Sequence, residues 1–163
     1  MIFVILGKSN SGKTTLADYM SAKCGIHKVI TSTSRPMRDG EVDKVDYNFY
    51  DYDTMKKDIE CGKYIEWAEF NGWLYGTKLA DIDLNKNVLI VLNPEGYKKI
   101  KALFGDKVVG IYLKPPTLTR LKRILKRDKS DYGEAVRRYW TDYKDFRGLG
   151  DDLIVIKSVF DIK

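Results

Sequence analysis

The sequence has very few of the residues that metal centres and histidine-based catalysis require. It contains one histidine, His27, and two cysteines, Cys24 and Cys61, at no metal-ligand spacing. These counts argue against a histidine-dependent catalytic triad and against a zinc site, so we expect His27 to be a loop residue. We expect both cysteines to be reduced, half-buried and structural, as in a cytosolic protein.

Long apolar runs are also missing. No run approaches the roughly 20 residues that a membrane-spanning helix needs. Met1 leads directly into an apolar run typical of a core strand, so we expect no cleavable signal and a cytoplasmic protein with no membrane contact. The chain has 163 residues, of which 44% are hydrophobic and 32% charged, as expected for one globular domain.

The charge balance favours an anionic ligand. The chain has 29 basic and 23 acidic residues, for a formal net charge of +6. A positive balance suits a nucleotide and also permits nucleic acid, so charge alone does not choose between them.

A glycine-rich loop stands at the start of the chain. Residues 7–14 read GKSNSGKT and match the pattern G-x-x-x-x-G-K-[ST]. The apolar run Ile2–Leu6 precedes the loop, and residues 15–23 have helical spacing of Leu16 and Met20. Strand, glycine loop and helix in this order predict a phosphate-binding loop.

The physical chemistry of this loop suits a nucleoside triphosphate. Gly7 and Gly12 allow backbone N–H groups to face one anion, and the following helix adds its unpaired N–H groups and its dipole. We expect Lys13 to reach the β- and γ-phosphates of ATP and Thr14 to ligate Mg²⁺. The predicted ATP-binding residues are Gly7, Ser9, Asn10, Ser11, Gly12, Lys13, Thr14 and Thr15.

The remaining pattern alternates strands with helices. This order predicts a parallel sheet that helices cover on both faces. The expected strands are 2–6, 28–31, 88–92, 107–113 and 153–156, and the expected helices are 13–24, 94–103, 117–128 and 131–146.

A different pattern interrupts this alternation. Residues 32–41 are polar and irregular, residues 53–61 predict a short helix capped by Asp53, and Asn71-Gly72 predicts a hairpin between strands 63–70 and 73–77. Residues 47–77 should therefore form a small antiparallel insert. Alternation places Glu69 on the face opposite Glu66, and Trp67 and Trp73 are expected in the core.

The motifs of this segment resemble the guanylate kinase family. They are TSRPMRDGE at 33–41, DYNF at 46–49, YIEWAEF at 64–70 and LYGT at 74–77. The resemblance implies a P-loop NTPase three-layer α/β fold in a single domain, 1–163. Its expected parts are a core (about 1–33, 78–114 and 147–163), an acceptor-binding region (about 34–77) and a helical lid (about 115–146).

The resemblance also implies a reaction in purine nucleotide metabolism. It implies a transferase that moves the γ-phosphoryl group of ATP, with Mg²⁺, to GMP or dGMP. In the family, the residues matching Arg35, Arg38, Tyr47 and Tyr75 hold the acceptor phosphate. Glu66 matches the position that reads guanine N1–H and N2–H. The other predicted guanine contacts are Thr31 and Thr77, facing O6, and Asn93.

The expected lid supplies arginines. Arg120, Arg123 and Arg127 share about one face of a predicted helix. The resemblance implies that Arg123, Arg127 and Arg138 act with Lys13 on the transferring phosphates. The basic helix carries no interleaved aromatic residues, which disfavours a nucleic-acid partner.

The chain departs from the family in several places. Val91 and Asn93 stand where the family has aspartates, and the segment 78–87 is shorter than the helix that the family has there. We also expect the chain to lack the family's usual final helix. A partner subunit could cover the exposed sheet face, so a homodimer is an open alternative. Three further alternatives are a kinase for another nucleoside monophosphate, a binding module without catalysis and a nucleic-acid-dependent ATPase.

Overall fold

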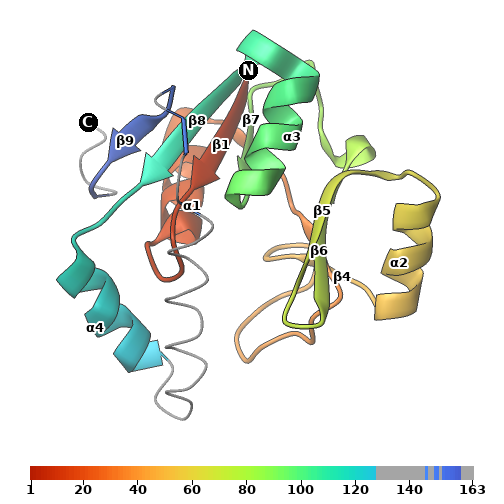
Figure 1. Ribbon diagram of the computed structural model, residues 1–163, viewed down its shortest axis with the longest axis horizontal. Coiled ribbons are helices and arrows are strands. Elements are labelled where there is room, and N and C mark those ends of the chain that lie inside the picture. Colours follow the sequence, from red (N-terminus) through yellow and green to blue (C-terminus); the bar gives the residue numbers. More distant parts are fainter. Residues whose placement is uncertain (128–145, 147–148, 151, 159–163) are drawn as a thin grey trace.

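A computed structural model describes residues 1–127, 146, 149–150 and 152–158. It confirms the three-layer α/β architecture, with a parallel core sheet between helices and a second, smaller sheet beside it (Figure 1). Within the described residues, no helix has both the length and the apolarity needed to cross a membrane.

The core sheet is parallel throughout, with strand order β2-β7-β1-β8-β9. Its inner strands are buried on both faces. This burial agrees with their sequences, which are continuous apolar runs rather than alternating ones. The strands are β1 (Ile2–Leu6), β2 (His27–Lys28), β7 (Val88–Val91), β8 (Val108–Leu113) and β9 (Ile154–Ile156).

Two helices cover opposite faces of this sheet. Leu16, Ala17 and Met20 of α1 (Lys13–Cys24) pack in one hydrophobic cluster, and Tyr97 and Ile100 of α3 (Pro94–Phe104) pack in another. The short 3-10 helices η1 (Leu79–Asp81) and η2 (Gly105–Lys107) complete the connections. Strands β1 and β7 end at the same edge, which is where open α/β sheets bind ligands.

The second sheet corrects the predicted insert. Its order is β4-β3-β6-β5, and β3 pairs in parallel with β4 but antiparallel with β6. It therefore begins at Ser32, in the segment that the sequence suggested was irregular. The elements are β3 (Ser32–Thr33), β4 (Asn48–Phe49), α2 (Tyr52–Glu60), β5 (Tyr64–Phe70) and β6 (Trp73–Lys78).

Local signals explain the turns of this insert. Asn71 and Gly72 both have positive φ (59° and 75°), which confirms the hairpin between β5 and β6. The cap of α2 is Asp51 rather than the predicted Asp53, because the Asp51 carboxylate accepts from the Thr54 N–H at 2.8 Å.

Several smaller expectations were wrong. The strand predicted at 28–31 is only His27–Lys28, because the chain leaves the core sheet there to enter the insert. Both cysteines are exposed rather than half-buried. Trp67 and Trp73 are 42% and 36% exposed and do not belong to the core.

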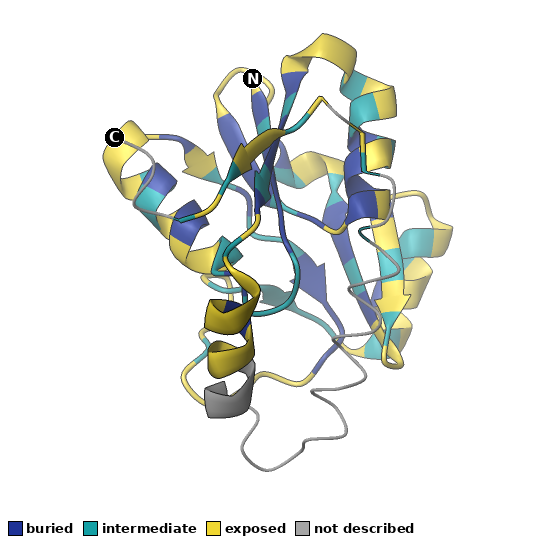
Figure 2. Ribbon diagram, turned by 60° about the vertical axis from the view of Figure 1, so that its left-hand side comes forward, coloured by how far each residue is buried: buried dark blue, intermediate teal, exposed yellow. Residues whose placement is uncertain are grey.

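Helix α4 (Thr117–Arg127) begins the expected lid. Figure 2 shows it projecting from the core with most of its described surface exposed, and Leu118 is 73% exposed. Arg120 is the exception and is buried. The predicted helix 131–146 lies outside the described residues except for Phe146.

Candidate nucleotide-binding site

The glycine loop joins β1 to α1 and has the backbone that a phosphate site requires. Asn10 and Gly12 adopt positive φ, 59° and 99°. Asparagine tolerates this region best among non-glycine residues, so the loop accepts it. A Cβ on Gly7 would lie 2.5 Å from Ser11 Oγ and 2.9 Å from the Leu113 carbonyl oxygen, so only glycine fits there.

Lys13 lies across this loop at the first turn of α1. Its Nζ donates to the Gly7 carbonyl at 2.7 Å and to the Lys8 carbonyl at 3.2 Å. The ammonium group is thus held at the carbonyl groups that begin the glycine loop. Thr14 and Thr15 follow it and are exposed.

A cavity of about 900 Å³ lies between the glycine loop and the insert. Residues 9–15 form one wall, and the predicted acceptor-phosphate residues form the opposite one. These are Arg35, Arg38, Tyr47 and Tyr75. The cavity also takes in Arg123 of α4, so it brings the predicted donor, acceptor and lid groups together.

Arg123 contacts the loop directly. Its Nη1 donates to the Ser11 carbonyl at 3.0 Å and lies close to Gly12. This bond places one predicted catalytic arginine at the phosphate loop. Arg127 ends α4 with its side chain outside the described set, and Arg138 lies outside the described residues.

A second cavity, of about 280 Å³, adjoins the first. Ser9, Lys13, Tyr47 and Tyr75 line both cavities, so the two lie side by side. The second cavity also has walls from three of the four residues predicted to contact guanine. These are Thr31, Glu66 and Asn93, whereas Thr77 does not line it.

Glu66 is the buried charge of this smaller cavity. It is 5% exposed, and its Oε1 accepts from the Thr77 hydroxyl at 2.5 Å. Burial raises the pKa of Glu66, although the Thr77 hydrogen bond and the Lys99 charge act in the other direction. Thr77 is itself fully buried and stands behind the carboxylate, so it orients Glu66 rather than lining the cavity.

Asn93 has a structural task beside Glu66. Its Oδ1 accepts from the Gly96 N–H at 2.7 Å and caps α3. A Cβ on Gly96 would lie 2.9 Å from Glu66 Oε2, so the carboxylate sits at the first turn of α3. By capping α3, the neutral Asn93 holds the first turn of this helix in place at the wall of the smaller cavity.

The phosphate clamp is the group of residues predicted to hold the acceptor phosphate, Arg35, Arg38, Tyr47 and Tyr75, and three of its side chains contact one another. The Arg35 guanidinium is buried and lies 5.4 Å from the Tyr47 ring centroid, and the Tyr47 and Tyr75 rings meet edge to face at 6.3 Å. Burial raises the pKa of Tyr47, so its hydroxyl stays a donor at neutral pH.

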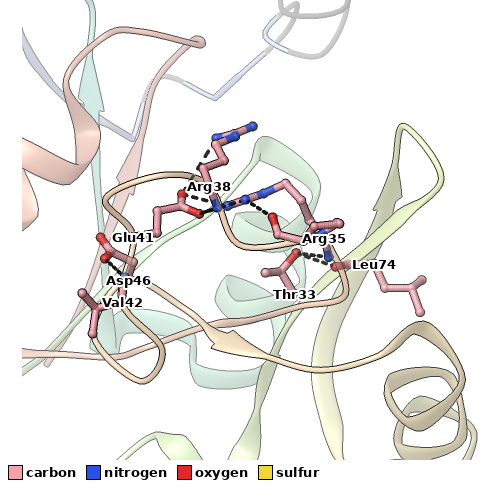
Figure 3. Close-up of polar contacts among 8 residues, drawn as sticks. Thr33, Arg35, Arg38, Glu41, Val42, Asp46 and Leu74 are labelled. Atoms are coloured by element: carbon pink, nitrogen blue, oxygen red, sulfur yellow. Dashed lines mark hydrogen bonds and ion pairs between the residues drawn. The ribbon is translucent and has the colours of Figure 1, made fainter.

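Sequence reasoning missed some residues of the site. Glu41 pairs with Arg35 and Arg38 (Figure 3), and Phe70 and Trp73 line the larger cavity. The end of the motif TSRPMRDGE was the available signal for Glu41. No signal marked the two aromatic residues, because apolar side chains in a strand usually indicate a core.

A phosphate loop at the carboxyl edge of a parallel sheet defines this molecule as a P-loop protein of the α/β class. Residues 1–155 match the guanylate kinase family. The chain belongs to that family.

Individual guanylate kinases are similar to this chain in sequence and in fold. A guanylate kinase of Sphingopyxis alaskensis is 34% identical over 141 residues, which are 83% of this chain and 64% of that protein. One of Chlorobaculum tepidum is 35% identical over 83% of this chain and 72% of its own length. The crystal structure of a guanylate kinase from Anaplasma phagocytophilum has the same fold, with a TM-score of 0.72, 23% identity, and coverage of 99% of this chain and 79% of that one.

Proposed function

We propose that this protein transfers the γ-phosphoryl group of ATP to GMP or dGMP. One observation carries the proposal: the buried carboxylate of Glu66 opens into a small cavity that shares Lys13 with the phosphate loop. Guanine presents two adjacent donors, N1–H and N2–H, and a carboxylate accepts both, whereas adenine has no such pair.

The donor half would hold the triphosphate. Residues 9–15, which include the start of α1, line the larger cavity, and their backbone N–H groups would bind the phosphates while Lys13 supplies the point charge. Arg123, already on the loop, is positioned to neutralise charge as the phosphoryl group moves.

The acceptor half would hold the monophosphate across the same cavity. Arg35 and Arg38 supply charge, and the hydroxyls of Tyr47 and Tyr75 supply neutral donors. The attacking oxygen belongs to an ionised phosphate, so no general base is needed. Catalysis then depends on positioning and charge neutralisation, with water kept out by the predicted lid.

Mg²⁺ would accompany ATP. Among the described residues, no group of three or more His, Cys, Asp or Glu side chains could hold a metal by itself. The exposed Thr14 hydroxyl lines the larger cavity, and Mg²⁺ commonly combines such a ligand with phosphate oxygens and water. The residues present therefore fit a metal that arrives with its nucleotide and supplies charge neutralisation there.

A kinase for another nucleoside monophosphate is the second candidate, because Val91 and Asn93 bring no charge to the smaller cavity. A binding module without catalysis would have no use for Lys13 and Arg123 at the loop. The cytoplasmic location and the homodimer stay predictions.

One assay separates these candidates. ADP release is measured with ATP and each of GMP, dGMP, AMP, CMP, UMP and dTMP. We expect turnover with GMP and dGMP and little with the others. Preference for another monophosphate would overturn the guanine assignment, and turnover with none would favour the binding module. ADP release that DNA or RNA stimulates without any monophosphate would favour the nucleic-acid ATPase.

A further inference from the structure

Glu41 lies among the predicted acceptor-phosphate residues, yet its own charge would repel a phosphate. Its Oε2 and Oε1 accept from Arg35 Nη1 and Nη2, both at 2.9 Å. The same Oε2 accepts from the backbone N–H of Arg38 at 2.9 Å (Figure 3). An acid that binds both arginines of the clamp calls for an explanation.

The donors of Arg35 show what this pairing leaves available. A guanidinium has five N–H donors. Nη1 uses one on the Pro36 carbonyl (2.6 Å) and one on Glu41, and Nη2 uses one on Glu41. Within the part of the chain that the structure describes, two donors remain, Nε–H and the second hydrogen of Nη2, and they lie on one edge of the plane. Such an edge is itself a fork that matches two phosphate oxygens.

The plane of this guanidinium is also fixed. Arg35 is 7% exposed, and its Cζ lies 5.4 Å from the Tyr47 ring centroid and 5.6 Å from that of Phe49. With its end held by Glu41 and its face held by the rings, the side chain has little rotational freedom to lose when a ligand binds.

Glu41 shapes the neighbouring backbone as well. Its N–H donates to the Arg38 carbonyl at 3.0 Å, while its carboxylate takes the Arg38 N–H and lies 4.0 Å from Arg38 Nη1. These bonds close the turn from Arg38 to Glu41 and keep Arg38 on the cavity wall. Burial opposes ionisation of Glu41, but the bonds from Arg35 and Arg38 outweigh it and hold its pKa below the ordinary value.

We infer that Glu41 is a positioning residue for the acceptor phosphate. It holds the end of Arg35 so that the free edge faces the phosphate, and it stays bound to Arg35 through turnover. The inference rests on the proposed function for the identity of the acceptor.

The test is Glu41→Gln. This change keeps the shape of the side chain but places an amide N–H₂ group against the N–H donors of Arg35 and Arg38. With GMP varied at saturating ATP, we expect KM for GMP to rise about tenfold or more, the scale of a hydrogen bond to a charged group. We expect kcat and KM for ATP to change less than about twofold. Glu69→Gln, the same change on the exposed face of β5, should change none of these values.

A double-mutant cycle shows whether Glu41 acts through Arg35. Lysine has no fork to orient, and the amide oxygen of the glutamine can still accept from the Arg38 N–H and hold that turn. In an Arg35→Lys background, Glu41→Gln should therefore change KM for GMP less than about twofold. An undiminished effect in that background, or equal losses in kcat and in both KM values, would mean a structural role. A fall in KM for GMP would mean that Glu41 competes with the phosphate. Each result would overturn the inference.

Calorimetric titration separates this inference from the proposed activity. Glu41→Gln should weaken binding of GMP but not of guanosine, which lacks the phosphate, and this readout needs no turnover. If the wild type binds GMP without phosphorylating it, the kinase proposal fails and the titration still decides the role of Glu41. If the wild type does not bind GMP, both fail.

Discussion

The donor and acceptor halves of the proposed site are built by different means. The donor half consists mainly of backbone: a loop of consecutive residues, with Gly12 at positive φ and the first turn of α1 behind it. The acceptor half consists of side chains from separate segments, held by pairs such as Glu66 with Thr77 and Arg35 with Glu41. The geometry of the donor half therefore depends on backbone conformation, and that of the acceptor half depends on pairing between side chains.

This difference determines which substitutions each half tolerates. The phosphate loop accommodates Asn10 at φ 59° because asparagine tolerates positive φ, but it has no room for a side chain on Gly7. In the acceptor half, removing one member of a buried pair leaves the other charged or polar and unpaired. Such changes should affect the acceptor far more than ATP.

The largest expected effect is that of Lys13→Ala. Among the described residues, it removes the one cation that lines both cavities, and turnover with every acceptor should fall by about 10³-fold or more. Stability should change by less than about 1 kcal/mol, because the Lys13 side chain is only partly buried and does not belong to the hydrophobic core. Steady-state kinetics and thermal unfolding check both. Loss confined to GMP would contradict the shared role.

The second-largest effect is expected for Glu66→Gln, which should impair use of GMP without impairing use of ATP. It places a donor against guanine N1–H, so kcat/KM for GMP should fall by about 10²–10³-fold while KM for ATP stays unchanged. Steady-state kinetics with each substrate varied measures both. An equal loss for ATP and GMP would show that Glu66 supports the fold rather than the acceptor.

The pKa of Glu66 gives this prediction a pH dependence. Its pKa is raised above 4.5 by burial, so kcat/KM for GMP should fall as the pH drops through that raised value, and Glu66→Gln should lose this limb. A raised pKa also means that the folded state binds the proton more tightly than the unfolded chain does. Ionised Glu66 thus lowers stability, and Glu66→Gln should gain stability over wild type as the pH rises through the same window.

Gly96→Ala should act mainly on the acceptor half. The new methyl would meet Glu66 Oε2 at 2.9 Å and displace it, so kcat/KM for GMP should fall about tenfold. The methyl would also lie 3.1 Å from the capping Asn93 Oδ1, so the melting temperature should fall slightly. Lys98→Ala, an exposed change in the same helix, is the control. Unchanged GMP kinetics would place the Glu66 carboxylate elsewhere.

The smallest effects compare two helix caps. Asn93→Ala and Asp51→Ala each remove a side-chain acceptor from a helix start and should each cost about 1 kcal/mol in chemical denaturation. Only Asn93 lines the smaller cavity, so only Asn93→Ala should also raise KM for GMP, by about threefold. A rise in KM with Asp51→Ala would show that cap loss alone disturbs the insert.

The same division explains what could be predicted from sequence. The phosphate loop is contiguous, so its motif and flanks were enough, and the Asn71-Gly72 turn was equally local. Alternation correctly separated buried Glu66 from exposed Glu69. These features depend on residues close together in the chain, or on a simple period of two.

Other features could not be predicted because distant partners create them. Ser32 and Thr33 looked like loop residues, yet they form a buried strand, with the Thr33 hydroxyl satisfied by the Leu74 carbonyl. Trp73 looked like a core residue, yet it lines a cavity that only the fold creates. Burial and pairing of these residues are properties of the assembled sheet.

The smaller cavity lies at the interface between the insert and the core, because residues of both line it. Glu66 of β5 lies against Gly96, and Lys99 Nζ donates to the Trp67 carbonyl at 3.3 Å, so β5 and α3 meet beside the proposed guanine site. A base bound there would add a third contact between β5 and α3. Amide hydrogen exchange in β5 and in the first turns of α3 should therefore slow together when GMP is added, because a ligand that binds only the joined form makes separation rarer.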